Sequence, residues 1–284
     1  MKTGYRRTDM TALTPRVMSC ASLGVSIVLA SVTVVAQQPP LSQRQGGPPP
    51  LPFELPADGD VWTALQSDDM MQKEVVIYRA ALLVPAESLQ LHTDTVKAIS
   101  KEVVRMRNDV HARFKKDPLS VNEGNSHSEY VTDLTMLLIN SRDPAAIDGL
   151  AAVAPLALKD FGEAAVPTLV AVARMEPEDE VGHSADALDA LGQILVRQGN
   201  MLLPNSKAAI RQVAAQRLES AKGNEQWRVL GEAAYLAVAT ADPQLRKQVE
   251  DMVDNNAEFA RRGMDKDSQD RVSQYARWAL DKFR

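Results

Sequence analysis

The sequence predicts an all-α protein, an α-solenoid in which antiparallel pairs of helices stack on one another. Three observations lead to this prediction. Beyond Asp58, apolar residues recur at steps of three and four, as they do on one face of a helix. Helix-start signals precede several of these stripes, and the expected helices repeat about every forty residues with two helices in each unit. No segment shows the alternation of apolar and polar residues that is typical of a half-buried strand.

Residues 1–36 have the order of residue types found in export signals. A stretch with four Lys or Arg residues ends at Arg16, and an uncharged run from 17 to 36 follows it. Val34 and Ala36 supply the small side chains that signal peptidase requires. We therefore expect a signal peptide that is cleaved between Ala36 and Gln37.

An uncleaved signal anchor is the alternative, because an uncharged run of 20 residues is long enough to cross a bilayer. The positive flank stays on the cytoplasmic side in both cases, so residue 37 onward is expected to be extracytoplasmic, periplasmic or secreted. A lipoprotein anchored through Cys20 is disfavoured, since Cys20 lies near the start of the apolar run and not after it. Membrane contact is expected only through an uncleaved anchor.

The composition limits the expected partners. Cys20 is the only cysteine, so a processed chain forms no disulfide and its core alone must stabilise the fold. The leader carries four basic residues and one acidic residue, so its removal changes the formal net charge from −5 to −8. Because an acidic surface opposes binding to polyanions, nucleic acid is not expected as a partner.

Residues 37–57 are rich in proline, with seven prolines between 37 and 56. Proline fixes φ and has no backbone N–H group to donate, so this segment is predicted to be an extended linker. The run Pro49-Pro50-Leu51-Pro52 also has the spacing of a polyproline II ligand, but a spacer is the favoured interpretation.

Residues 58–118 are expected to form an N-terminal helical cap. A helix is predicted over about 93–114, because its apolar residues follow a single stripe of Val96, Ile99, Val103, Met106 and Val110. This helix is too long for one member of a repeated pair. We therefore separate the segment from the repeats that follow it.

Residues 119–284 are expected to hold the helical repeats. Asp143-Pro144 and Asp242-Pro243 each place a capping carboxylate before a proline at the first helical position. Other helices are expected to begin near residues 184, 225 and 268. The predicted buried stripes are Val166, Leu169, Val170 and Ala173; Leu188, Leu191 and Leu195; Ile210, Val213, Ala214 and Leu218; Trp227, Leu230 and Ala234; Leu245, Val249 and Met252; and Val272, Tyr275, Ala279 and Phe283.

Over about residues 126–284 the sequence resembles the HEAT and armadillo repeat families. The resemblance is carried by DPAAIDGLAAVA at 143–154, FGEAAVPTLVAVAR at 161–174, SADALDALGQIL at 184–195 and DPQLRKQVEDMV at 242–253. It implies stacked helix pairs and says almost nothing about activity. The many alanines would let neighbouring helices approach closely.

No motif predicts a reaction. The chain lacks the H-E-x-x-H zinc signature, the G-x-S-x-G and S-x-x-K serine motifs and a glycine-rich phosphate loop. His127 and Glu129 match the H-x-E of zinc deaminases, but no cysteine pair follows, and Ser126 with Glu129 is better interpreted as a helix capping box. We therefore predict no catalytic residue, cofactor site or metal site.

Two acidic features have simpler explanations than a functional site. The run Glu-Pro-Glu-Asp-Glu at 176–180 lacks the spacing and the glycine of a calcium loop, so a solvated loop before the next helix is favoured. Glu219-Ser220 and Glu87-Ser88 match the catalytic Glu-Ser pair of helical lytic transglycosylases. Neither pair is followed by the glycine-rich segment of that family, which favours chance.

Two functional hypotheses remain. The favoured one is a noncatalytic scaffold that binds another envelope protein or a peptide. Its rival is a helical enzyme that acts on cell-wall glycan through one carboxylic acid, and a carboxyl of raised pKa in a deep cleft would favour it. For binding, Tyr235 is the candidate residue, because the stripe of its helix leaves it near the exposed side with Arg228 and Glu232.

Overall fold

The computed structural model describes residues 55–82, 89–116, 125–175 and 177–284, without the side chains of 110–111, 113–116, 125–128 and 177–181. Within these ranges all regular structure is helical and there is no strand, so the predicted all-α class is confirmed. The α-helices are α1 Asp58–Gln66, α2 Met70–Leu82, α3 Thr93–Lys116, α4 Asn125–Ser141, α5 Ile147–Val153, α6 Val166–Ala173, α7 Pro177–Gln198, α8 Pro204–Ser220, α9 Trp227–Ala239, α10 Pro243–Met252, α11 Asn256–Arg261 and α12 Lys266–Lys282. Short 3-10 helices are η3 Pro144–Ala146, η4 Pro155–Asp160, η5 Gly162–Ala165 and η6 Asn224–Gln226.

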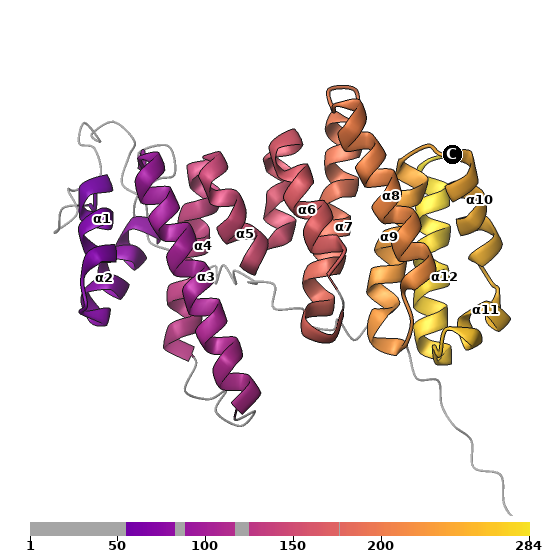
Figure 1. Ribbon diagram of the computed structural model, residues 1–284, viewed down its shortest axis with the longest axis horizontal. Coiled ribbons are helices and arrows are strands. Elements are labelled where there is room, and N and C mark those ends of the chain that lie inside the picture. Colours follow the sequence, from indigo (N-terminus) through magenta and orange to yellow (C-terminus); the bar gives the residue numbers. More distant parts are fainter. Residues whose placement is uncertain (1–54, 83–88, 117–124, 176) are drawn as a thin grey trace, which may run out of the picture. The chain divides into compact units, whose positions relative to one another are not determined.

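The helices pack mainly against others that are near them in the sequence. Helix α1 contacts α2 and α3, and α3 contacts α4 and α5. Further along the chain, α6 contacts α7 and α8, α7 contacts α9, and α9 contacts α8, α10 and α12. These helices belong to one compact unit, and Figure 1 shows α12 beside α9, with α10 and α11 beyond it. Each helix therefore buries its apolar face against neighbours one to three elements away.

Two hydrogen bonds that join α7 to α9 and α9 to α12 connect residues about one predicted period apart in the sequence. Arg228 on α9 donates a 2.5 Å hydrogen bond to Asp186 on α7, 42 residues before it. Tyr275 on α12 donates a 2.8 Å hydrogen bond to Glu232 on α9, 43 residues before it. The forty-residue spacing of the sequence thus corresponds to contacts between α7, α9 and α12.

The predicted helix starts at the two Asp-Pro pairs are confirmed. The Asp143 carboxylate accepts a 2.8 Å hydrogen bond from the backbone N–H of Ala145, where η3 begins. The Asp242 carboxylate accepts hydrogen bonds of 2.9 and 3.2 Å from the N–H groups of Gln244 and Leu245 in the first turn of α10. These carboxylates satisfy backbone donors that have no partner within their helix.

The predicted apolar stripes form most of the core. Helix α3 begins at Thr93, as expected, and buries Val96, Ile99, Val103 and Met106. Of the later stripe residues, these are buried: Val166, Leu169, Val170, Ala173, Leu188, Leu191, Ile210, Val213, Ala214, Leu218, Leu230, Ala234, Leu245, Val249, Met252, Val272 and Ala279. Leu195, Trp227, Tyr275 and Phe283 are only partly buried at the edge of the core.

The prediction of a loop at 176–180 is wrong for its described part. Helix α7 begins at Pro177, about two turns before the expected start near residue 184. Proline is favourable at the first helical position, because its missing N–H would have no partner there. The acidic residues at 178–180 therefore belong to the first turn of α7 and do not precede it.

The leader 1–36, the cleavage site at Ala36 and Gln37, and the linker up to residue 54 lie outside the described residues, as do Glu87, Ser88 and Glu176. The same holds for the side chains of Ser126 and His127 in the predicted capping box. In the described part of the chain, no helix combines the length and the apolar character needed to span a bilayer.

Candidate functional site

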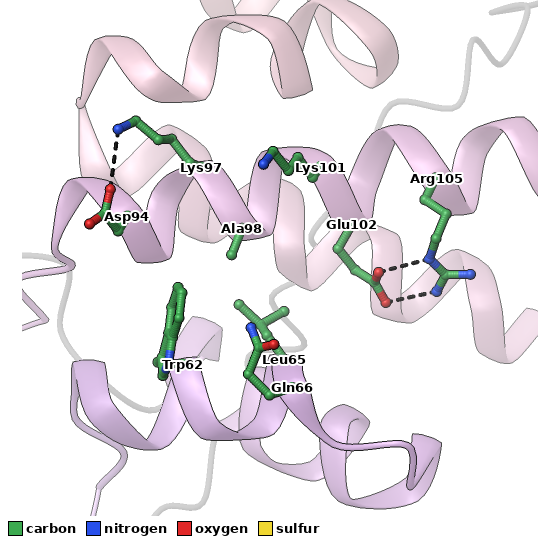
Figure 2. A pocket seen from close by; sticks show the side chains of 9 residues that line it. All are labelled: Trp62, Leu65, Gln66, Asp94, Lys97, Ala98, Lys101, Glu102 and Arg105. Carbon is green, nitrogen blue, oxygen red and sulfur yellow. Dashed lines mark hydrogen bonds and ion pairs between the residues drawn. The ribbon is translucent and has the colours of Figure 1, made fainter.

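A groove between α1 and α3 is one of the surface clefts of the N-terminal helices. Its volume is about 430 Å³. Trp62, Leu65 and Gln66 of α1 form one wall. The α3 wall consists of Asp94, Lys97, Ala98, Lys101, Glu102 and Arg105. In Figure 2 the side chains of Trp62 and Leu65 on α1 point toward Ala98 on α3, so the floor of the groove is apolar and its rim is charged.

The local sequence of each helix explains these positions. Val61 and Ala64 are the buried residues of α1, which leaves Trp62 on a neighbouring face where it is 41% exposed. On α3 the buried stripe begins with Val96 and Ile99. The α3 residues that line the groove lie one or two positions away from this stripe in the sequence, and they therefore form a separate face of the helix.

Glu102 is held as a carboxylate. It accepts two hydrogen bonds of 2.9 Å from the guanidinium group of Arg105, and Lys73 lies 3.6 Å from it. The hydrogen bond from Arg105 is the main cause that lowers the pKa of Glu102, against the opposing effect of burial. Because a general acid must be protonated at the working pH, Glu102 is not suited to that role.

A second cleft, between α2 and α4, contains a carboxyl group with the opposite property. Asp133 is almost fully buried, and burial together with the nearby charge of Glu129 raises its pKa to about 6. The cleft has a volume of about 380 Å³, and its walls also include Glu74, Tyr78 and Arg79. Asp133 is therefore partly protonated near neutral pH, as a general acid would need to be.

Among the described carboxyl groups Glu232 has the largest rise in pKa, to about 8, but it lies in the core. Its side chain is 4% exposed and sits where α7, α9 and α12 meet. Burial is the main cause of the shift, and the charge of Asp189 adds to it. Glu232 lines none of the clefts described above, so we assign it to the core and not to a surface site.

The prediction that Tyr235 is near the exposed side is wrong. Tyr235 is 3% exposed, and Glu232, also expected outside, is buried too. Ten of the thirteen residues of α9, from Val229 to Val238, are buried, because α7, α8, α10 and α12 surround this helix. We therefore assign Tyr235 to the core and expect its replacement by alanine to reduce stability, whatever it does to binding.

Tyr235 belongs to an aromatic cluster at the C-terminal end of the chain. Its ring stacks on Trp278 with ring centroids 5.3 Å apart and meets Phe283 at 5.6 Å. The ammonium group of Lys282 lies 4.9 Å from the centroid of Tyr235 and 4.7 Å from that of Trp278. Trp278 is 46% exposed, so it and not Tyr235 is the surface aromatic residue of this region.

Of the two Glu-Ser pairs, only Glu219-Ser220 lies in the described part of the chain. Glu219 lies on the exposed C-terminal end of α8, and the side chain of Arg262 donates to its backbone carbonyl and not to its carboxylate. Among the side chains that the structure describes, no group of three or more His, Cys, Asp or Glu residues could hold a metal ion.

Comparison of the chain with protein-family models, with curated proteins and with solved structures gives no match. The α1–α3 groove was missed from the sequence. Its only signals were Trp62 on α1 and the spacing of Lys97, Lys101 and Arg105 at four-residue intervals. Neither signal indicates that the two helices face each other.

Proposed function

We propose that this protein is an exported, noncatalytic α-solenoid of HEAT-like helix pairs that binds another envelope protein, or a peptide, in the α1–α3 groove. The observation that carries the proposal is the groove itself. It combines an exposed Trp62, an apolar floor and a charged rim, and its carboxylate Glu102 is ionised and paired with Arg105. Such a surface is suited to binding, because exposed aromatic residues with adjacent charges are typical of interface hot spots.

The solenoid part of the proposal is supported by the spacing of contacts. Helices α7, α9 and α12 meet in succession, and the residue pairs that join them are 42 and 43 residues apart. A stack of repeated helix pairs places equivalent residues of neighbouring units side by side in this way. Residues 58–118 would then cap the first unit, with the long helix α3 as the wall of the groove.

The export part of the proposal depends on the order of residues in 1–36. N-terminal sequencing of the protein recovered from its own cells should begin at Gln37 if signal peptidase cleaves after Ala36. Retention of residues 1–36 in the membrane fraction would establish the signal anchor. An intact chain in the cytosol would contradict both forms of export.

Affinity capture tests the binding function. The full chain with a C-terminal affinity tag would be expressed in its own host and used to capture proteins from the envelope fraction. Trp62→Ala should lose captured proteins that the wild-type chain retains. Trp278→Ala is the matched control, because Trp278 has a similar exposure of 46% against 41% and lies outside the groove. If the wild-type chain and Trp62→Ala capture the same proteins equally well, with unchanged circular dichroism, the groove is not the binding site.

A second candidate function, glycan cleavage by a single acid, is favoured by Asp133. Asp133 has both a raised pKa and a place in a cleft. The test is release of soluble fragments from purified cell-wall glycan by the wild-type chain and by Asp133→Asn. A release that requires Asp133 would establish the enzyme. If neither the wild-type chain nor Asp133→Asn releases fragments above background, glycan cleavage is excluded and the proposed binding function remains.

A further inference from the structure

Lys101 is the free cation of the groove. Lys97 bonds to Asp94 at 3.1 Å, and Arg105 bonds to both Glu102 and Asp109. Lys101, which is exposed, makes no ion pair or hydrogen bond with any described residue, and in Figure 2 no dashed line reaches it. A cation that the protein leaves unpaired beside an apolar surface is available to an acidic group from outside.

Lys101 also has a central position on the surface of α3. Lys97, Lys101 and Arg105 lie one helical turn apart, at steps of about 6 Å. All three line the groove toward α1. They also line another cleft, distinct from the one between α2 and α4, which Ala145 and Asp148 help to form. They therefore form a basic ridge between two clefts, and a chain segment in either cleft would pass Lys101.

An apolar contact lies beside this cation. Ala98 is three residues before Lys101 on α3, and both line the groove. Across the groove, the Trp62 ring and Leu65 complete the apolar floor. A ligand that places a carboxylate on Lys101 can thus also place an apolar side chain against Trp62.

The charge of the groove favours an acidic ligand. Its walls carry three cations, Lys97, Lys101 and Arg105, and two carboxylates, and both carboxylates are already paired with cations of the groove. This positive excess is found on a chain whose formal net charge is −5. Positive potential confined to one groove steers negatively charged partners toward it.

We infer that the α1–α3 groove recognises an acidic peptide segment of a partner protein, with a carboxylate bound by Lys101 and an adjacent aliphatic or aromatic side chain packed on Trp62. The inference rests on the proposed binding function and specifies its partner. Extended peptides fit this arrangement, because alternate side chains of an extended chain lie about 7 Å apart on one face, close to the 6 Å steps of the ridge.

A library of random twelve-residue displayed peptides, selected on the full chain, tests the inference. Peptides selected on the wild-type chain should be enriched in Asp or Glu next to an aliphatic or aromatic residue. Selection on Lys101→Glu should instead enrich Lys or Arg at the equivalent position, because the substitution reverses the charge that the peptide meets. Lys207→Glu, at a half-buried lysine of α8 outside the groove, is the control and should leave the wild-type preference unchanged.

The affinity of the chain for a synthetic peptide with the consensus sequence then measures how much the acidic residue contributes to binding. Replacing its Asp or Glu by Asn or Gln, or using Lys101→Glu, should weaken binding by about tenfold or more, and binding should fall as salt is raised. A wild-type selection that yields no binders, or binders without acidic enrichment, would overturn the inference. If Trp62→Ala still abolishes capture of an envelope protein in that case, the binding function stands and only the acidic specificity is wrong.

Discussion

The hydroxyl group of Tyr275 donates a 2.8 Å hydrogen bond to Oε1 of Glu232, a carboxyl group that is 4% exposed. Its other oxygen, Oε2, has no hydrogen-bond partner among the described residues. Asp189 and Asp186 on α7 add negative charge around Glu232, which Arg228 on α9 partly offsets. Burial and the charge of Asp189 raise the pKa of Glu232 to about 8, so the group is mostly protonated at neutral pH.

Because of this pKa, Glu232 should make folding less favourable as the pH rises. Below about pH 4.5, its ordinary pKa, the group is protonated in both the folded and the unfolded chain. Between pH 4.5 and 8 the unfolded chain releases the proton while the folded chain keeps it. In this window each pH unit lowers the free energy of unfolding by at most about 1.4 kcal/mol, and the effect levels off above the folded pKa.

Glu232→Gln should remove this pH dependence, because an amide keeps the shape of the protonated acid and does not ionise. We expect the variant to be about 2–4 kcal/mol more stable than the wild-type chain at pH 8, and close to it at pH 5. Urea unfolding at both pH values measures the difference. Glu219→Gln, at an exposed position of α8, is the control. A variant whose stability follows the wild-type pH profile would contradict the assignment.

The buried side chain of Arg217 caps the C-terminal end of α6. Arg217 is 1% exposed, and its Nε donates a 2.5 Å hydrogen bond to the carbonyl of Ala173, while Nη2 donates to the carbonyl of Met175. The last carbonyls of a helix have no partner within it and lie at the negative end of its dipole. Arg217→Met keeps the apolar stem but leaves these carbonyls without the guanidinium, so it should cost about 2–4 kcal/mol in urea unfolding.

The matched control for this substitution lies on the same helix. Arg211 is exposed and its Nε is 3.6 Å from Asp242, so Arg211→Met should cost less than about 1 kcal/mol. Equal losses for the two variants would mean that the carbonyls of Ala173 and Met175 do not depend on Arg217.

The features that were predicted correctly depend on the spacing of residues within one short segment of the sequence. The stripe of Leu188 and Leu191 and the cap at Asp242 follow from spacing within one helix, and both are confirmed. The stripe rule failed for α9, because it assumes one buried face. Its run from Val229 to Val238 consists almost wholly of small and apolar residues, which is typical of a helix surrounded on all sides.

The groove and the raised pKa of Glu232 could not be predicted for a different reason. Both depend on residues that are far apart in the sequence. The groove needs Trp62 of α1 to lie across from Ala98 of α3, 36 positions later, and the pKa of Glu232 depends on Asp189 and Tyr275, each 43 positions away. Periodicity indicates which residues are buried but not which charged groups meet.

Gly192 on α7 lies directly against the ring of Tyr235 on α9. A Cβ atom at position 192 would overlap Cε1 and Cδ1 of this ring. The ring is held from other directions by Trp278 and Phe283, at centroid distances of 5.3 and 5.6 Å, so it has little room to move. Gly192→Ala should therefore cost about 1–3 kcal/mol, even though alanine is the better helix former.

Two further variants separate overlap with the ring from a general effect on α7. Gly182→Ala lies on the same helix in open space, so it should be neutral or stabilising by up to about 1 kcal/mol. Tyr235→Leu removes the ring that Gly192→Ala meets. If overlap is the cause, Gly192→Ala should cost less in the Tyr235→Leu background than in the wild-type chain, and urea unfolding of the four chains of this cycle measures the difference. Strictly additive losses would mean that the alanine is destabilising for a reason other than contact with Tyr235.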